Sequence, residues 1–494
     1  MKGCQSRVSS IVLNDSGGED LSSGETPKQL EEQDFPTHNS NSQEKHDDDI
    51  YAEAGDQIYN RFSKRRKRLI TFTVSLCGFL SPMSSTTVLS AIPEVAQTFQ
   101  TTGSVINISN ALYLAFMGLS PLVFGPLTAI YGRRWLVLSS GVLFTAWSIS
   151  TALAPNLASF FMFRMLTAFQ GTGFLIIGST IISDIYRPVE RATALGWFLC
   201  GTQIGPALGP FIGGLIVTYR SWRVIFWLQS ALASFATILV IVALPETIHR
   251  KKAEELKQIQ KGSEKAKKIC QWMNPFRVFV LFKIPNLAIM GLGTGSLVWN
   301  MYSLMSPIRY VLNPRFNLTT PLQSGLFFLA PGCGYVLGTL VGGQWADYTV
   351  KKWIRKRGTR IPEDRLRSSL PFMGFIIPAC MLIYGWSVDK EKGGIALPVI
   401  TMFLQGIAQL FCFPSLNVYC LEVIPGRSSE VIGGNYVARY ISGAIGTAVA
   451  IPAIEKIGVG WFSTISAVYL VFSTVLVYVT VLFGAEWRSK ASKA

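Results

Sequence analysis

The chain is poor in charged residues for its length. Asp, Glu, Lys and Arg together account for 15% of its 494 residues and His for only three, whereas 49% of the residues are hydrophobic and the mean hydropathy is +0.34. Soluble domains carry roughly 25% charged residues. The composition therefore argues against an ordinary soluble domain and is typical of a membrane protein.

Signatures of several other protein classes are missing. No H-E-x-x-H pair, G-x-S-x-G nucleophile elbow or phosphate-binding loop stands in a convincing setting, which argues against an enzyme and against a bound metal or cofactor. The eight Cys form no paired framework and most fall within apolar runs, so no disulfides are expected. No cleavable signal peptide is visible, because the first apolar run begins near Leu69.

Long apolar runs are the dominant feature of the sequence. Runs of about 20 residues match the thickness of the hydrocarbon core. They predict an all-α membrane protein with twelve transmembrane helices, arranged as six plus six, a layout that also disfavours a seven-helix receptor. The predicted spans are 69–93, 104–128, 134–154, 158–183, 192–218, 222–244, 285–311, 322–345, 370–388, 395–419, 431–454 and 461–484.

The net charge of +16 is concentrated between these spans. Lys and Arg cluster in residues 61–68, 133–134, 251–268 and 351–360, which fall on one side of the membrane if the spans alternate. The opposite loops are short and carry few basic residues. Because basic loops stay in the cytosol, both termini are predicted to be cytosolic, and a nucleic-acid partner is not expected.

The chain divides into two halves and two tails. Residues 1–66 are polar, and acidic toward Asp49, so they are predicted to be a disordered cytosolic tail. Four further parts are predicted: a six-helix bundle over 67–245, a basic cytosolic linker over 246–284, a second six-helix bundle over 285–485 and a short cytosolic tail over 486–494.

The fifth span is unusually rich in glycine and proline. Residues 201–214 contain five Gly and two Pro, with Gly205, Pro206 and Gly209 at their centre. Gly at intervals of four lets a neighbouring helix approach closely, and Pro removes a backbone donor and permits bending. The span is predicted to pack tightly and to act as a hinge; a static glycine contact between helices is the alternative.

Two loops show a trace of internal repetition. In Gly125–Arg134 and in Gly343–Lys352, a Gly precedes two adjacent basic residues by the same spacing, once in each half. The first loop resembles the G-x-L-A-D-R-x-G-R-R motif of the major facilitator superfamily, and the glycine-rich fifth span resembles the corresponding signature of its proton-driven exporters. The matching positions in the first loop are Gly125, Leu127, Gly132, Arg133 and Arg134.

Further matches extend the resemblance over residues 69–484, and together they resemble the fungal twelve-span drug:proton antiporters, near the quinidine-resistance-type and organic-acid exporters. These matches are Arg164, Gln170-Gly171, Pro245-Glu246-Thr247, Pro425-Gly426-Arg427, Asn435 and Arg439. The resemblance implies a major facilitator fold whose two bundles rock about a central cavity. It also implies export of small organic molecules across the plasma membrane, coupled to protons. A monomer without a cofactor is expected.

The sequence departs from the motif at one position. Ala129 stands where the family has an acid that helps to latch one conformation, so this latch is expected to be weaker or replaced. Asp347 keeps the acid in the second half.

Two arginines, Arg164 and Arg439, lie one to two turns inside predicted spans and are candidates for contact with substrate or for proton transfer. The alternative is that each guanidinium braces helices through carbonyl groups. No Asp or Glu lies well inside a span, and Arg cannot release its proton. Three interpretations stay open: coupling through a carboxylate at a span end, a substrate that carries the proton, or uncoupled transport. The carboxylates at span ends are Glu94, Asp184, Asp347 and Glu422.

Polar residues in the spans that face the cavity in the family are further binding candidates. They are Ser85, Trp299, Asn300 and Gln405. Gln203 and Asn435, in other spans, are secondary candidates. A hydroxyl such as that of Ser85 has the simpler alternative of bonding its own helix. Asn317 begins an N-x-T sequon in a short outer loop, a possible glycosylation site. The expected function is export of drugs, toxins or secreted metabolites; a carrier for a specific organic anion is the alternative, since the spans hold two arginines and no acid.

Overall fold

The computed structural model describes residues 61–186, 188–247, 264, 272, 276–359, 361–423 and 428–493. Within these residues the chain is helical and has no strand. The predicted tail over 1–60 and most of the predicted linker lie outside them. Helix α2 begins at Lys64, capped by the Ser63 side chain, so the predicted boundary at residue 66 falls within its first turn.

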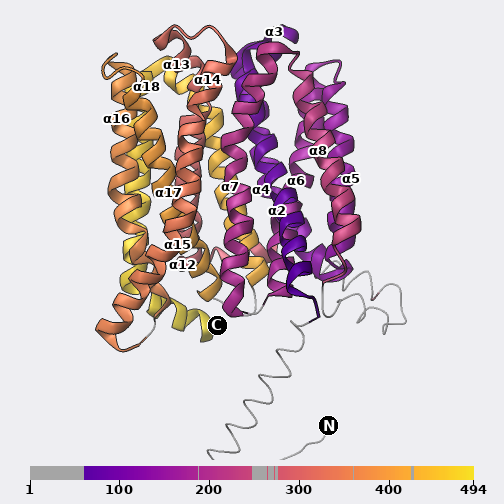
Figure 1. Ribbon diagram of the computed structural model, residues 1–494. Coiled ribbons are helices and arrows are strands. Elements are labelled where there is room, and N and C mark those ends of the chain that lie inside the picture. Colours follow the sequence, from indigo (N-terminus) through magenta and orange to yellow (C-terminus); the bar gives the residue numbers. More distant parts are fainter. Residues whose placement is uncertain are drawn as a thin grey trace, which may run out of the picture. The chain divides into compact units, whose positions relative to one another are not determined.

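The first half holds six long helices, drawn from indigo to magenta in Figure 1. The first is broken near one end, where a 3-10 turn separates α2 from a short helix. The elements are α2 (Lys64–Thr87), η1 (Val88–Ala91), α3 (Ile92–Thr98), α4 (Gly103–Tyr131), α5 (Arg133–Ala152), α6 (Leu157–Ile185), α7 (Pro188–Tyr219) and α8 (Arg223–Ala243).

The second half, drawn in orange and yellow, has more breaks. Its elements are α11 (Phe276–Leu281), α12 (Pro285–Met305), α13 (Ile308–Phe316), α14 (Pro321–Phe327), α15 (Leu329–Arg357), η2 (Pro362–Ser368), η3 (Phe372–Ile376), α16 (Ile377–Asp389), α17 (Ala396–Val423) and α18 (Ser428–Lys493). Within α18 the backbone leaves the helical region at Gly458, with φ 84° and ψ 165°, which divides α18 into two spans.

The structure accounts for the twelve predicted spans when α18 is counted as two spans and α12 is included. Ten helical stretches are long and apolar enough to cross a membrane, and one of them, Glu430–Lys490, contains the break at Gly458. Helix α12 supplies the twelfth span: it is 21 residues long but carries polar residues such as Asn286, Thr294 and Asn300. The second span of α18 continues as helix to Lys493, through the predicted short tail.

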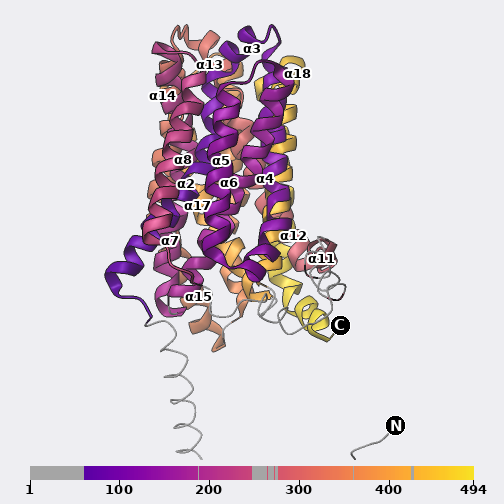
Figure 2. The ribbon, with the colours of Figure 1, turned by 90° about the vertical axis from the view of Figure 1, so that its right-hand side faces the viewer.

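The two ends of the bundle differ. Short helices α3, α13 and α14 lie together at what we call the upper face, and the C-terminal end of α18 lies at the opposite, lower face (Figures 1 and 2). One buried apolar cluster belongs to the first half alone, and a larger one includes residues of both halves, among them Leu89, Tyr113, Tyr302 and Tyr440. The halves therefore share a continuous core.

The glycine-rich span packs closely on the first span. A Cβ atom placed on Gly205 would lie 2.9 Å from the backbone nitrogen of Met83, and one on Gly209 would lie 2.8 Å from its carbonyl oxygen. These distances are shorter than real side chains allow, so glycine is what permits α7 to approach α2. Both contacts lie within the first half, between α7 and α2.

Candidate functional site

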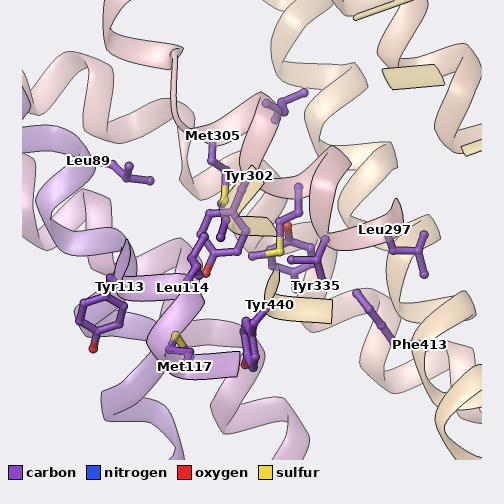
Figure 3. Packing of buried hydrophobic residues seen from close by; sticks show 14 of the residues in the cluster. Leu89, Tyr113, Leu114, Met117, Leu297, Tyr302, Met305, Tyr335, Phe413 and Tyr440 are labelled. Carbon is purple, nitrogen blue, oxygen red and sulfur yellow. The ribbon is translucent and has the colours of Figure 1, made fainter. Parts of the chain in front are cut away.

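Buried tyrosines form a layer where the two halves meet. The hydroxyl of Tyr302, on α12, lies 3.1 Å from the Oγ of Ser85, on α2, so this contact joins the halves. The Tyr113 hydroxyl donates to the Ser84 Oγ at 2.8 Å. Figure 3 shows Tyr302, Tyr335 and Tyr440 near one another, with Tyr113 to one side, on helices of both halves. Ser85 also donates to the carbonyl of Pro82 in its own helix, at 2.7 Å.

Arg164, on α6, is enclosed at the edge of this layer. Its side chain is 1% exposed, and its Nη1 donates to Ser109 Oγ at 2.9 Å and to Asn110 Oδ1 at 2.8 Å, both on α4. The Tyr113 ring lies 5.1 Å from the guanidinium carbon. Nε and Nη2 have no hydrogen-bond partner among the described residues. Arg164 thus joins α4 to α6 and keeps donors to spare.

Arg439, on α18, has a different environment. Its guanidinium carbon lies 4.4 Å from the centre of the Phe413 ring, 5.7 Å from that of Tyr436 and 5.6 Å from that of Tyr440. The side chain is half-buried, and its Nε is buried without a hydrogen-bond partner among the described residues. Arg439 is therefore a cation among aromatic rings.

Asn435, one turn before Arg439, belongs to a polar network inside the second half. Its Nδ2 donates to Asn417 Oδ1 at 2.9 Å, and its Oδ1 accepts from Thr294 Oγ1 at 2.5 Å. Gln405, on α17, is 3% exposed, and its Oε1 has no partner among the described residues. Gln405 therefore keeps a free acceptor, whereas the contacts of Asn435 are made within the protein.

Three other candidates have contacts of their own. The Trp299 indole donates to Ser466 Oγ at 3.0 Å, and the Asn300 amide donates to the Ser466 carbonyl at 3.3 Å, so both residues pack toward the last span. Gln203, on α7, is half-buried in the first half. Among the described residues, no hydrogen bond joins any of these three to Arg439.

Arg133 organises the lower face of the first half. Its backbone N–H donates to Glu246 Oε1 at 2.9 Å, and its Nε donates to Asp184 Oδ2 at 3.1 Å. Gly132 precedes it with φ 96°, a conformation that favours glycine, and separates α4 from α5. Arg134 donates to the carbonyl of Ile241 at 3.1 Å. The basic pair of the motif thus ties α5 to the ends of α6 and α8, and Gly125 accepts from Thr128 Oγ1 within α4.

The second half contains acids besides Asp347. Asp347 is 64% exposed and lies 3.7 Å from Arg365, a long contact. The buried acids are Glu363 and Asp364 in η2: Asp364 pairs with Arg357 at 3.1 Å, and Glu363 accepts from the Tyr419 hydroxyl at 3.4 Å. The sequence analysis missed both, because they lie between spans, where an acid gives no signal of burial.

At the upper face an ion pair crosses from one half to the other. Arg309, on α13, donates from Nη1 to Glu94 Oε2 at 2.6 Å and from Nη2 to Glu94 Oε1 at 2.5 Å, and also donates to the Ser90 carbonyl. Nearby, the Leu322 N–H donates to Thr218 Oγ1 at 3.1 Å, again between halves. The sequence marked Glu94 but not its partner, 215 positions away.

The other residues singled out from the sequence either lie on the surface or are not among those that the structure describes. Asn317 is exposed after α13 and adopts the left-handed conformation, with φ 51°. The side chain of Ala129 and the residues Pro425, Gly426 and Arg427 lie outside the description. Among the described residues no group of His, Cys, Asp and Glu is arranged to hold a metal ion.

Comparison with known proteins identifies the family. A family model described as the Major Facilitator Superfamily matches residues 74–447. The chain is 26% identical to the efflux pump radE of Floropilus chiversii, covering 84% of this chain and 80% of the relative. It is 22% identical to the MFS antiporter QDR3 of Candida albicans, covering 84% and 78%.

The fold is also found among solved structures. The human organic anion transporter MFSD10 (TETRAN) superposes with a TM-score of 0.62 at 16% identity, over 83% of this chain and 99% of that one. The predicted major facilitator fold is thereby confirmed, with two bundles of six transmembrane helices. The matched residues include Arg133, Arg164 and Arg439. The chain belongs to the Major Facilitator Superfamily and is an integral membrane transporter of small molecules, not an enzyme.

Proposed function

We propose that this transporter exports small organic molecules from the cytosol across the plasma membrane by alternating access, driven by protons. The observation that carries the mechanism is the distribution of ion pairs between the two halves. At the upper face Glu94 pairs with Arg309 across the halves, whereas at the lower face the described pairs, such as Arg133 with Asp184 and Arg357 with Asp364, each lie within one half. An ion pair that joins the halves at the upper face, where the described pairs at the lower face do not, suits two halves that rock about a shared core.

The distribution of basic residues indicates which face is cytosolic. The basic start of α2, Lys64–Arg68, and the basic end of α15, Lys351–Arg357, lie at the lower face (Figure 2), and on this basis we place the lower face in the cytosol. The upper face is then extracellular, and the state described is closed on the outside. A substrate would enter the tyrosine layer from the cytosol and leave after Glu94 and Arg309 separate.

The names of the relatives support export. One is called an efflux pump and one an antiporter, and a third, from Saccharomyces cerevisiae, is a dityrosine transporter 24% identical over 472 residues. A monomer is sufficient for this mechanism, because the layer where the halves meet is built from one chain.

Whole-cell efflux tests the proposal. A strain that overexpresses the protein is loaded with fluorescent or radiolabelled compounds, cationic drugs beside organic acids, and retention is compared with a strain carrying the empty vector. We expect faster loss of at least one compound, and slower loss when a protonophore collapses the proton gradient. Equal retention in both strains for the whole panel, with the protein present in the plasma membrane, would contradict export.

A further inference from the structure

Two permanent cations and no acid lie well inside the predicted spans. Arg164 and Arg439 lie inside transmembrane helices, and no Asp or Glu lies well inside any of the twelve predicted spans. A guanidinium stays protonated, and a charge at membrane depth is costly unless an opposite charge or hydrogen-bond acceptors compensate it. No carboxylate well inside a span can therefore compensate either arginine. What matters is which hydrogen-bond acceptors surround each one.

Arg164 has acceptors of its own. Ser109 and Asn110 each accept a bond from its Nη1, and the side chain is almost completely enclosed. These contacts link α4 to α6, so the main role of this arginine is to position the two helices. It is less suited to a first contact with a ligand, because a ligand could reach it only after the surrounding side chains had moved.

Arg439 has no such acceptors. Among the described residues no hydrogen bond or ion pair satisfies its guanidinium, although the side chain is half-buried and its Nε is fully buried. The exposed part does not face the lipid side of the helix. Ile445, which is 51% exposed, marks that side, and Arg439 precedes it by six residues, which is about 120° round an α-helix. The guanidinium therefore points into the protein, toward Phe413 on α17.

The aromatic surroundings leave the edge of the guanidinium available. Phe413, Tyr436 and Tyr440 surround its carbon atom at 4.4 to 5.7 Å, and the two tyrosine rings stack with centres 5.8 Å apart at 12°. Rings that attract a cation through their faces do not accept its N–H groups as a carboxylate does. The planar edge of Arg remains a bidentate donor, and the rings provide flat apolar surface beside it.

We propose that Arg439, with Phe413, Tyr436 and Tyr440, forms a binding site for organic anions that carry a carboxylate on a planar aromatic body. The guanidinium edge holds the carboxylate, and the three rings contact the body of the ligand. The inference rests on the proposed function for its role in transport, but the binding site itself does not depend on the direction of transport or on coupling to protons.

Equilibrium binding to the purified full-length protein in lipid nanodiscs tests the site. Three probes share one aromatic body and differ in charge: 2-naphthoate, 2-naphthamide and 2-naphthylmethylammonium. We expect 2-naphthoate to bind about tenfold to a hundredfold more tightly than the amide, the usual effect of a hydrogen bond to a charged group, and the ammonium to bind most weakly.

Variants assign the preference to Arg439. Arg439→Gln should remove the difference between naphthoate and naphthamide, whereas Phe413→Leu should weaken both probes and keep their order. Arg66→Gln is the matched control, because Arg66 also lies over a ring, that of Phe62 at 5.7 Å, but is exposed outside the spans. This control should bind all three probes as the unaltered protein does. A monodisperse elution profile shows that each variant is folded.

Four results would overturn the proposal: tightest binding of the ammonium, equal binding of naphthoate and naphthamide, no binding of any probe by folded protein, or a preference for naphthoate that survives Arg439→Gln. The result for export is separate. If the protein binds naphthoate but does not lower retention in cells, the binding site is supported and the proposed function is removed. If cells export only cations and the protein does not bind naphthoate, the proposed function is supported and the binding site is removed.

Discussion

Glu94 and Arg309 form a bidentate ion pair between the two halves of the transporter, although 215 positions separate them in the sequence. Glu94 follows the break between α2 and α3, and Arg309 lies on α13, just after the first span of the second half. Their side chains are 30% and 10% exposed, so the pair is only partly screened by solvent. It holds together the spans that begin each half, at the upper face.

Removing this pair should favour separation of the halves at the upper face. Because a partly exposed pair contributes roughly 1 kcal/mol, Glu94→Gln or Arg309→Gln should shift the equilibrium about threefold to tenfold. The measurement is disulfide cross-linking of Thr218→Cys with Leu322→Cys, whose positions meet across the halves. We expect slower cross-linking in either variant and partial recovery when Glu94→Arg is combined with Arg309→Glu. Unchanged cross-linking would show that the pair does not hold the upper face closed.

Enlarging the glycines of α7 should stop transport. Gly205→Leu and Gly209→Leu each insert a side chain where a single Cβ already lies within 3 Å of Met83 backbone atoms, so α7 and α2 must separate. Efflux should be lost while the amount of protein in the membrane stays the same. Gly196→Leu is the control, because a Cβ there meets nothing within 4 Å. Normal efflux by both variants would remove the hinge assigned to this span.

Arg164 should tolerate neither Ala nor Lys. Its Nη1 donates to two acceptors on α4 and its guanidinium carbon lies 5.1 Å from the centre of the Tyr113 ring, whereas lysine is shorter and has no planar guanidinium to keep both contacts. We expect efflux to be lost in Arg164→Ala and not restored in Arg164→Lys, with both proteins still inserted. Substantial efflux by the lysine variant would mean that charge alone is required at this position.

The orientation of the halves has its own test. Asn317→Cys, in the exposed segment after α13, should react with a membrane-impermeant thiol reagent added to intact cells, and Lys261→Cys, in the basic linker, should react only after permeabilisation. The reagent reaching Lys261→Cys from outside would reverse the assignment of faces.

The sequence predicted features that depend on one helix, but not contacts between distant segments. The spans followed from hydropathy, and even α12 was found, although Asn286, Thr294 and Asn300 make it less apolar than the others. The close approach of α7 to α2 followed from the spacing of Gly205 and Gly209, because glycine repeats act locally along one helix.

Contacts between distant segments could not be predicted in the same way. The partner of Glu94 lies in the other half, and the direction of Trp299, toward Ser466, depends on helix rotation. Asp364 is buried in η2 and pairs there with Arg357 and Arg367, although its sequence surroundings resemble those of an exposed loop acid. Likewise the sequence marked both Arg164 and Arg439 but could not tell them apart. Only the contacts show that Arg164 joins two helices and that Arg439 lacks acceptors among the described residues.

Transport into inside-out plasma-membrane vesicles tests the central claim most directly. In such vesicles the cytosolic face is outside, so an exporter driven by protons should accumulate a compound identified by whole-cell efflux when the lumen is more acidic than the medium. The account predicts accumulation that depends on the protein and on the acidic lumen and that a protonophore abolishes. Accumulation that ignores the proton gradient, or none at all with the protein present, would contradict it.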